Sequence, residues 1–214
     1  MSYIQQSKSS ALYVYIYDSL EKEATGEAGK WWLHNSLLKL QLSLKEKFNI
    51  NLIVIEGEAD PTIKGLIKKY NINEVIWNRL YSQKSINRDS VIKKSLQENN
   101  INVQTFNGHL LNEPWEVQNN SGQYFKVFTP YWRRAYDVYQ SKKYQVKNIS
   151  DIKSLKHQEK SKWNFLPQKK WYLKFEDHWE PGEDAALSKL KKYINEDIDH
   201  YKEGRDRPDL DKTS

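Results

Sequence analysis

The chain has 214 residues, of which 38% are hydrophobic, 29% charged and 13% aromatic. This composition is that of a globular protein with one good core or one domain and part of another, because disordered chains are poor in aromatic residues. The absence of cysteine excludes disulfides, thiolate catalysis and cysteine-based zinc sites. The 34 Lys and Arg residues against 28 Asp and Glu are compatible with a nucleic-acid partner, but they are dispersed and support one only weakly.

The sequence contains no recognisable targeting, membrane or metal signal. Residues 1–10 are polar and lack the apolar region of a secretory signal. Apolar runs reach about six residues, far short of the ~20 that a membrane-spanning helix needs. The five histidines are scattered, and no pair has the spacing of a metal-binding motif. We therefore predict a cytoplasmic protein with no membrane partner and no metal site.

Short apolar runs alternate with helical patterns in the first half of the chain. After the polar lead-in at residues 1–10, residues 11–17 (ALYVYIY) are predicted to form a buried strand, because they are aromatic and β-branched. The apolar residues of the helix that follows recur at spacings of three and four: Leu33, Leu37, Leu40, Leu44 and Phe48. Residues 52–55 (LIVI) are a continuous apolar run, as expected for a strand covered on both faces.

Two more helices and two more strands complete this alternation. Asp60 and Pro61 predict an N-cap and a first helical position. The apolar face of that helix consists of Ile63, Leu66, Ile67 and Tyr70. The remaining predicted elements are strands at residues 74–77 and 101–106 and a helix at residues 89–96. The β-α-β-α-β-α-β order predicts a mostly parallel sheet with helices on both faces.

The pattern changes after Gly108. Residues 141–182 are polar and lysine-rich, and we predict an interdomain connector that three tryptophans pin to a surface: Trp163, Trp171 and Trp179. Pro181 and Gly182 predict a turn, after which Glu183 and Asp184 suit the positive end of a helix dipole. The face of that helix is marked by Leu187, Leu190, Ile194, Ile198 and Tyr201.

Common phosphate-binding and nucleophile motifs are absent from the sequence. There is no GxGxxG, no GxxxxGK[ST] and no GxSxG, so an ordinary dinucleotide site, P-loop or hydrolase elbow is not predicted. Carboxylates are numerous, but none is paired in a way that indicates acid–base catalysis. We predict a solvated surface for most of them.

Four segments of the chain share a more specific pattern. The first reads KWWLHNSL at residues 30–37, and the second reads WNRLY at residues 77–81, followed by Arg88-Asp89. The third, within residues 106–132, contains FN, LL, EPW and FKVFTPYW in that order. The fourth, within residues 179–214, contains W, PGE, Y, RD, P and TS in that order. Core packing is the simpler explanation of any single tryptophan among them. Together and in this order, the segments resemble the DNA photolyase/cryptochrome family over nearly the whole chain from Ala11.

The resemblance implies the N-terminal portion of a deoxyribodipyrimidine photolyase. Its fold class is then α/β: a Rossmann-like, mostly parallel antenna domain with flanking helices at residues 11–140, a connector at residues 141–182, and the start of an all-α FAD-binding domain at residues 183–214. The family reaction is the light-driven repair of pyrimidine dimers in DNA, in which excited reduced FAD passes an electron to the dimer. FAD and dimer-containing DNA are therefore the implied cofactor and partner.

The resemblance also implies site residues in the last segment. The implied contacts with FAD are Tyr201, Thr213 and Ser214. Hydroxyl and backbone donors of this kind can hold flavin phosphates without a glycine loop. Arg205 corresponds to a residue that faces the DNA backbone near the lesion. For Arg205, a surface ion pair with Asp206 or Asp209 is the alternative.

The family's α/β domain often carries a second, light-harvesting chromophore, whose identity stays open in this chain. One common form holds a folate with an Asn-Glu pair, and Lys84 and Ser85 stand in those places here. The open alternatives for the antenna are a deazaflavin, a flavin, a differently held folate or no antenna chromophore. Asn78 and Arg79 follow a predicted strand, where α/β sheets bind ligands, although a structural role in the loop is an equal alternative.

Two departures from the family limit the expected function. Residues 1–10 lack the family's first strand and its WFRxDLRxxDN motif, and because that strand lies in mid-sheet we expect two strand edges with unpaired backbone groups. The helical domain that encloses FAD would follow Ser214. We therefore expect no catalytic residues here and no repair by this chain alone. It would be a fragment of a degraded or split gene, or half of a two-chain assembly in which a companion chain supplies the FAD domain. The alternatives are a cryptochrome-like light-sensing module and an inactive gene remnant.

Overall fold

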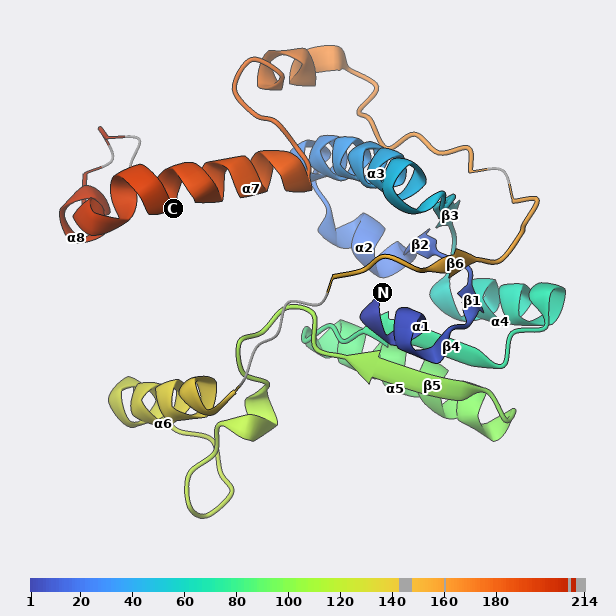
Figure 1. The fold of residues 1–214 in the computed structure, drawn as a ribbon, viewed down its shortest axis with the longest axis horizontal. Coiled ribbons are helices and arrows are strands. Elements are labelled where there is room, and N and C mark those ends of the chain that lie inside the picture. Colours follow the sequence, from blue (N-terminus) through green and yellow to red (C-terminus); the bar gives the residue numbers. More distant parts are fainter. Residues whose placement is uncertain (143–147, 160, 208, 211–214) are drawn as a thin grey trace. The chain divides into compact units, whose positions relative to one another are not determined.

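The computed structural model describes residues 1–142, 148–159, 161–207 and 209–210 (Figure 1). Two compact units make up the chain. The first unit comprises Met1–Gly57 and Ile149–Ser214, and the second comprises Glu58–Asn148. Each unit has its own core, so each is described by itself.

The first unit contains the chain's longest helix and two short parallel ladders. Its elements before residue 58 are α1 (Ser2–Ser7), β1 (Ser10–Ala11), β2 (Val14–Tyr17), α2 (Ser19–Ala24), α3 (Glu27–Phe48) and β3 (Ile53–Glu56). Its later elements are β6 (Lys153–Ser154), a 3-10 helix (Lys170–Phe175), α7 (Glu183–Lys192), a π-helical turn (Tyr193–Asp197), a 3-10 turn (Ile198–His200) and α8 (Tyr201–Gly204).

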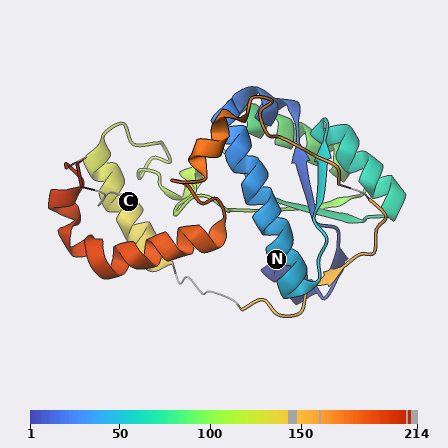
Figure 2. The same ribbon diagram turned by 90° about the horizontal axis from the view of Figure 1, so that it is seen from above.

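The predicted spacing of apolar residues in α3 produces the core of the first unit. Four of the five predicted stripe residues of α3 belong to one cluster with residues of β2 and β3, whereas Leu40 is 43% exposed. α3 lies beside these strands in Figure 2. The buried members of this cluster are Tyr17, Leu37, Leu44, Ile50, Leu52, Val54, Ile152 and Phe165. Trp163 of the connector packs against the cluster as predicted, whereas Trp171 and Trp179 remain about half exposed. Trp163 and Phe165 therefore attach the connector to the core of the first unit.

The predicted strand at residues 11–17 is divided between two ladders. β2 pairs in parallel with β3, with Val14 opposite Ile53. β1 pairs instead with β6, with Ser10 opposite Lys153. The polar residues before β1 form the short helix α1, from which Ile4 packs against the core cluster. One apolar run therefore supplies strands to two partners, which its composition did not indicate.

The second unit is a smaller α/β arrangement. Its elements are α4 (Ala59–Tyr70), β4 (Glu74–Asn78), α5 (Gln83–Glu98), β5 (Asn102–Phe106), a 3-10 helix (Pro114–Glu116) and α6 (Phe128–Ser141). β4 and β5 pair in parallel over their whole length. α5 contributes Ile92 and Leu96 to a core with Val103 of β5, and partly buried residues of α4 pack against it (Figure 1).

Two helix starts differ from the prediction. α4 begins at Ala59, so its N-cap is Glu58 rather than Asp60. Asp60 lies in the first turn, where a carboxylate interacts favourably with the helix dipole and Asp60 also pairs with Lys64 at 2.8 Å. α5 begins at Gln83, well before the predicted start at residue 89, because the Ser82 hydroxyl accepts a hydrogen bond from the Ser85 amide and caps the helix.

The predicted α/β class with parallel strands and flanking helices is confirmed. Within the described residues, however, the strands form three two-stranded sheets rather than one sheet. None of the described helices is both long enough and apolar enough to cross a membrane.

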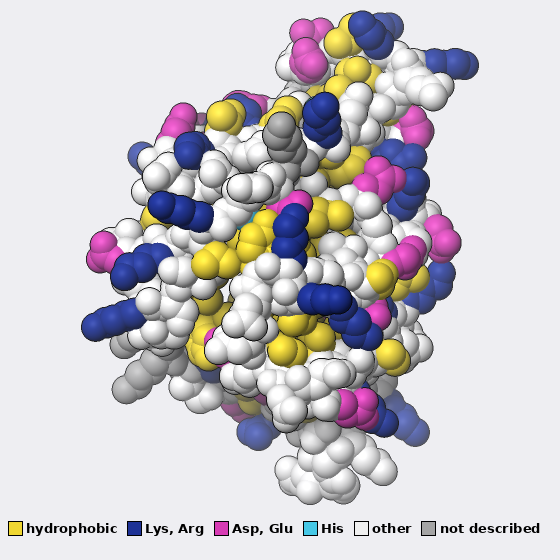
Figure 3. All heavy atoms as spheres, turned by 90° about the vertical axis from the view of Figure 1, so that its right-hand side faces the viewer, with side chains coloured by type: hydrophobic (Ala, Val, Ile, Leu, Met, Phe, Trp, Pro, Cys, Tyr) yellow, Lys and Arg dark blue, Asp and Glu magenta, His cyan; other side chains and the backbone are white. Residues whose placement is uncertain are grey.

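The molecular surface carries mixed charge. Figure 3 shows one face on which Lys and Arg side chains alternate with Asp and Glu, with hydrophobic side chains visible between them. Neither sign of charge covers that face by itself. The charge pattern therefore adds nothing to the weak indication of a nucleic-acid partner that net charge provides.

Candidate functional site

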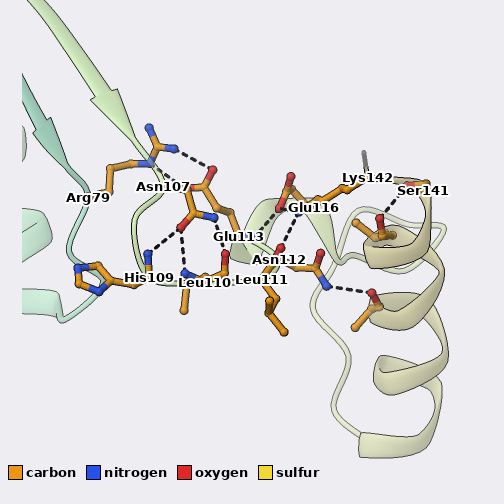
Figure 4. A network of polar contacts seen from close by, with 12 residues as sticks. Arg79, Asn107, His109, Leu110, Leu111, Asn112, Glu113, Glu116, Ser141 and Lys142 are labelled. Carbon is orange, nitrogen blue, oxygen red and sulfur yellow. Dashed lines mark hydrogen bonds and ion pairs between the residues drawn. The ribbon is translucent and has the colours of Figure 1, made fainter. Parts of the chain in front are cut away.

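An arginine–carboxylate pair lies at the carboxyl ends of β4 and β5. Arg79 follows β4 directly and forms a bidentate ion pair with Glu113 (Figure 4). Its Nε donates to Oε1 at 2.7 Å and its Nη2 donates to Oε2 at 2.8 Å. Its Nη1 donates to the carbonyl and hydroxyl oxygens of Thr105 in β5, at 2.6 and 2.9 Å. One side chain thus joins the ends of two strands to the loop beyond them.

Burial and hydrogen bonding act in opposite directions on Glu113. Only 8% of this residue is exposed, and burial opposes ionisation of its carboxyl group. Hydrogen bonds from Arg79 and from the Tyr81 hydroxyl, the latter at 2.6 Å, outweigh burial and hold the pKa of Glu113 below its ordinary value. The same hydrogen bond from Arg79 raises the pKa of the guanidinium group. The pair is therefore ionised at neutral pH.

A second carboxylate connects this loop to α6. Glu116 accepts a hydrogen bond from the Glu113 amide at 2.5 Å and an ion-pair contact from Lys142 at 2.7 Å. Lys142 also donates to the carbonyl oxygen of Leu111. The side-chain amide of Asn112 donates to the carbonyl oxygen of Ala135 within α6 (Figure 4). These bonds attach α6 to the loop at residues 111–116 through polar groups.

The arrangement indicates a structural role for Arg79 rather than a ligand site. Its three guanidinium nitrogens are all used by Glu113 and Thr105, and its guanidinium carbon lies 5.6 Å from the Trp115 ring. The loop after β5 also approaches closely, since a Cβ on Gly108 would lie 2.6 Å from the Asn78 amide nitrogen. Of the two roles left open for Arg79, the structure favours the structural one.

The candidate flavin and DNA residues lie at the far end of the α7–α8 helical run. Tyr201 begins α8, and its ring packs edge-on against Tyr193 with a centroid separation of 6.5 Å. The Arg205 guanidinium lies 6.0 Å from the Tyr201 ring, and its Nε lies 3.5 Å from Asp206. The structure thus brings Tyr201 and Arg205 together. Thr213 and Ser214 lie outside the described residues.

The surroundings of Arg205 match one alternative from the sequence. Its ion pair is with Asp206, whereas Asp209 pairs with Arg207 at 2.6 Å. Both pairs are exposed, and exposed pairs contribute little to stability. Arg205 therefore needs only a weak contact to be broken before it could turn toward another anion.

The helical run that carries Tyr201 presents an uncovered apolar face. Its five predicted stripe residues are between 41% and 55% exposed: Leu187, Leu190, Ile194, Ile198 and Tyr201. Such a row of large apolar side chains is unusual on a surface helix of a monomer. The spacing that predicted the helix was correct, and the face it predicts lacks a partner within the described residues of its unit.

The start of α7 is fixed on α3. Lys39 of α3 lies under the turn, where a Cβ on Gly182 would approach it to 3.2 Å, and it pairs with Glu180 at 3.6 Å. The Trp32 and Trp179 rings meet edge-on at a centroid separation of 6.3 Å. A cavity of about 310 Å³ lies here and is lined by groups of both charges, so it indicates no particular ligand. α7 is anchored at its first residues, and the rest of its stripe extends from that anchor.

Sequence reasoning did not identify the Arg79–Glu113 pair. Both residues were part of recognised segments, but 34 positions separate them and no local pattern joins them. Lys142 likewise lay in the predicted connector, with no sign that it would hold Glu116. In the part of the chain that the structure describes, no cluster of His, Asp or Glu could hold a metal ion.

Comparisons with known proteins identify the family. The sequence model of the family described as DNA photolyase matches residues 4–149. The deoxyribodipyrimidine photo-lyase of Agrobacterium fabrum is 37% identical over 193 residues, which cover 88% of this chain and 40% of that protein. Cryptochrome-2 of Arabidopsis thaliana is 34% identical over 113 residues, which cover 53% of this chain and 18% of that protein.

A solved structure is similar over almost the whole chain. The crystal structure of a bacterial class III photolyase from Agrobacterium tumefaciens superposes with a TM-score of 0.82 and 32% identity, covering 96% of this chain and 43% of that one. The chain therefore spans less than half the length of the photolyases it matches. On the family match, and with the α/β fold and the helical run in the same order, this chain belongs to the DNA photolyase family.

Proposed function

We propose that this chain is the N-terminal part of a deoxyribodipyrimidine photolyase and that it does not repair DNA by itself. The reaction would be the light-driven, FAD-dependent splitting of pyrimidine dimers in DNA, in the cytoplasm. Support comes from the similarity to the photolyases of Agrobacterium, of which this chain spans 40% to 43%. The enclosed FAD site would be completed by polypeptide that corresponds to the remaining part of those photolyases, whether or not it belongs to the same chain.

The exposed stripe on α7 is the observation that carries this proposal. Apolar surface left in water costs about 25 cal/mol for each Å² that burial would remove, so five large side chains in a row favour a partner. α7 is anchored at Gly182 and is uncovered beyond it. A helical FAD-binding domain that packs on Leu187, Leu190 and Ile194 would bury this face and meet Tyr201 at the same time.

The residues for FAD and DNA fit one edge of such a site. We propose that Tyr201, Thr213 and Ser214 contact FAD and that Arg205 faces the DNA backbone. Bound FAD would supply the electron-transfer chemistry. The exposed Tyr201 ring and the weak Arg205–Asp206 pair leave both side chains available, but they shelter nothing from water. A dry pocket therefore has to be completed by other chain segments. We assign no antenna chromophore to the described residues.

Repair of dimer-containing DNA tests the proposal directly. The purified chain, with FAD, reductant and blue light, is expected to give no repair, whereas full-length Agrobacterium photolyase in the same assay is active. Addition of a separately produced polypeptide that corresponds to the remainder of the Agrobacterium enzyme is expected to give a complex that retains FAD. Repair by the chain alone would contradict the proposal.

A pair of matched variants identifies the docking face. Ile194→Asp places a charge on the stripe and is expected to weaken the complex at least about tenfold, because a buried unpaired charge is costly. Leu42→Asp places the same charge on α3, at a residue of similar exposure away from the stripe. If both variants bind the companion equally well, the stripe is not the docking face.

A second candidate function rests on the similarity to Cryptochrome-2. In that case the chain is part of a non-catalytic light-sensing module, and it would copurify with a chromophore that absorbs near-ultraviolet or blue light without supporting repair in any mixture. An inactive remnant is the third possibility, for which a thermal melt would show no cooperative transition.

A further inference from the structure

We propose that the connector of the first unit binds a single strand of nucleic acid, whose phosphates contact lysines and one of whose bases stacks on Trp171. Residues 153–174 form this part of the connector, the lysine strip. The site is separate from Arg205, and it does not depend on the proposed repair function. It consists of residues of the first unit alone.

The positive charge of the chain is concentrated in the lysine strip. Basic residues are dispersed along the whole sequence, but their excess over acidic residues is not. The strip contains seven lysines and one acidic residue, Glu159, and this excess equals the net charge of +6 of all 214 residues. The remaining residues are therefore neutral overall. Acidic residues bound the strip at both ends, with Asp151 before it and Glu176 and Asp177 after it. A polyanion would thus meet a localised positive charge on the connector.

The lysines of the strip are exposed and lack acidic partners. Six of the seven lie in the described part of the chain, and no ion pair within that part involves them: Lys153, Lys156, Lys162, Lys169, Lys170 and Lys174. Exposed lysines elsewhere are paired, such as Lys22 with Glu56 at 2.6 Å. Unpaired ammonium groups neutralise phosphates without first breaking a contact within the protein, and each phosphate neutralised releases counterions from the nucleic acid.

The end of the strip carries a tryptophan whose ring is held in place although part of it is exposed. Trp171 is 41% exposed and lies in the 3-10 helix Lys170–Phe175. Its ring packs edge-on against the rings of Tyr172 and Phe175, with centroid separations of 6.3 and 5.2 Å. Phe175 packs in the same way against Trp31, a buried residue of α3, at 5.3 Å. A base that stacks on Trp171 would therefore meet a ring whose position the fold already fixes, so little conformational entropy is lost on binding.

An exposed aromatic ring among ammonium groups matches single-stranded nucleic acid. Every base has a flat face that stacks on an aromatic ring, and lysines follow the phosphate backbone, so such a surface binds without sequence preference. A segment that binds a lipid surface is instead an amphipathic helix with a continuous apolar face. Residues 155–159 and 161–169 of the strip form neither helix nor strand. These observations favour nucleic acid over a lipid surface.

Fluorescence anisotropy of the intact chain with a fluorescein-labelled oligothymidylate of about fifteen nucleotides tests the proposal. The strand contains no dimer and the assay uses no light, so the result is independent of repair. We expect saturable binding. The logarithm of the binding constant should fall with the logarithm of salt concentration with a slope of about −3, which corresponds to about four phosphate contacts on a single strand.

Two triple variants with the same net charge test the position of the site. Replacing Lys169, Lys170 and Lys174 with Gln should reduce the slope to about −1 and weaken binding at low salt by at least about tenfold. The control replaces three exposed lysines of α4 and α5 with Gln: Lys64, Lys68 and Lys94. It should bind within about twofold of the parent chain, because distant exposed charges are screened.

A second pair of variants tests the stacking ring. Trp171→Leu keeps an apolar side chain but removes the ring, so it should weaken binding by at least about fivefold without changing the salt slope. Trp171→Phe keeps a ring and should retain most of the affinity. Circular dichroism checks that every variant is folded as the parent chain is.

Several outcomes would overturn the proposal. They are no saturable binding, equal affinity of the two triple variants, and unchanged binding by a folded Trp171→Leu chain. Tighter binding to anionic phospholipid vesicles than to oligothymidylate, through the same lysines, would overturn the assignment to nucleic acid. Oligouridylate is measured in parallel to distinguish RNA from DNA, and lysine-dependent binding of either strand supports the proposal.

Discussion

α3 and α7 share one sequence pattern and differ in what becomes of it. Both helices carry large apolar residues at spacings of three and four. In α3 the stripe is mostly covered: Leu37 is 4% and Leu44 7% exposed, although Leu40 between them is 43% exposed. In α7 the corresponding residues Leu187 and Leu190 are 55% and 52% exposed. Periodicity therefore predicts a face that requires a partner, and only the fold shows whether the partner is present.

α6 is an intermediate case between these two helices. Three of its aromatic side chains form an exposed row, with Phe128 stacked on Trp132 and Trp132 beside Tyr136. Polar bonds from Asn112 to Ala135 and from Lys142 to Glu116 hold this helix in place of apolar packing. α7, which lacks an apolar partner, is thus attached at one end, and α6 is attached by a few polar groups. Substitutions in these two helices should therefore change the free energy of unfolding less than substitutions in the packed helix α3.

The largest expected effect is in the packed helix. Leu44→Ala should lower the free energy of unfolding by about 3 kcal/mol, because it removes a buried side chain and leaves a cavity in the core of the first unit. Urea unfolding followed by circular dichroism measures this change. A loss below about 1 kcal/mol would mean that the α3 stripe is less well packed than the structure shows.

The next effect concerns the polar attachment in the second unit. Glu113→Gln should lower the free energy of unfolding at pH 7 by about 2 kcal/mol, because the Arg79 guanidinium loses its ionised partner in a buried position. Arg79→Ala with Glu113→Gln should restore part of the loss. A double variant as unstable as the sum of the single changes would contradict the coupling of the pair.

The stability of the chain should also depend on pH through the Arg79–Glu113 pair. The pKa of Glu113 is lowered in the folded chain, so its contribution is present above the ordinary value of 4.5 and is lost as pH falls through the lower, folded value. Glu116 behaves likewise, because the hydrogen bond from Lys142 lowers its pKa. Between pH 7 and about pH 3.5 the parent chain should lose more stability than Glu113→Gln. Equal losses would show that the pair does not titrate as described.

A smaller effect is expected where α7 joins α3. Gly182 has a φ of 112°, which side-chain-bearing residues rarely adopt, and its missing Cβ faces Lys39. Gly182→Ala should therefore cost about 1 kcal/mol and loosen the start of α7. Gly65→Ala is the matched control, since nothing lies within 4 Å of a Cβ there and the residue is inside α4. The control should be neutral or slightly stabilising. Equal effects of the two changes would contradict the contact.

The smallest expected effect is on the exposed stripe. Leu190→Ala in the isolated chain should change the free energy of unfolding by less than about 0.5 kcal/mol, because the side chain is half exposed and loses little packing. The same substitution in a complex with a companion helical domain should weaken binding clearly. A loss in the isolated chain as large as that of Leu44→Ala would end the contrast between the two helices.

Local pattern accounts for most of the fold that the sequence could predict. The strands at β3, β4 and β5 and the helices α3 and α7 follow from apolar spacing. The family resemblance placed Tyr201 and Arg205 in one segment of the chain, and in the structure the guanidinium lies beside the ring. Contacts between distant residues were not predictable. Ser161 reaches the edge of β3 across 107 positions, and Arg79 reaches Glu113 across 34, by hydrogen bonds that no periodicity encodes.

Amide hydrogen exchange of the isolated chain tests the central contrast most directly. We expect slow exchange in the middle of α3, where Leu37 and Leu44 are buried, and fast exchange in α7 beyond its first turn, where Leu190 is half exposed. Addition of the companion domain should slow exchange in α7 without changing α3. Protection of α7 equal to that of α3 in the isolated chain would contradict the claim that this face awaits a partner.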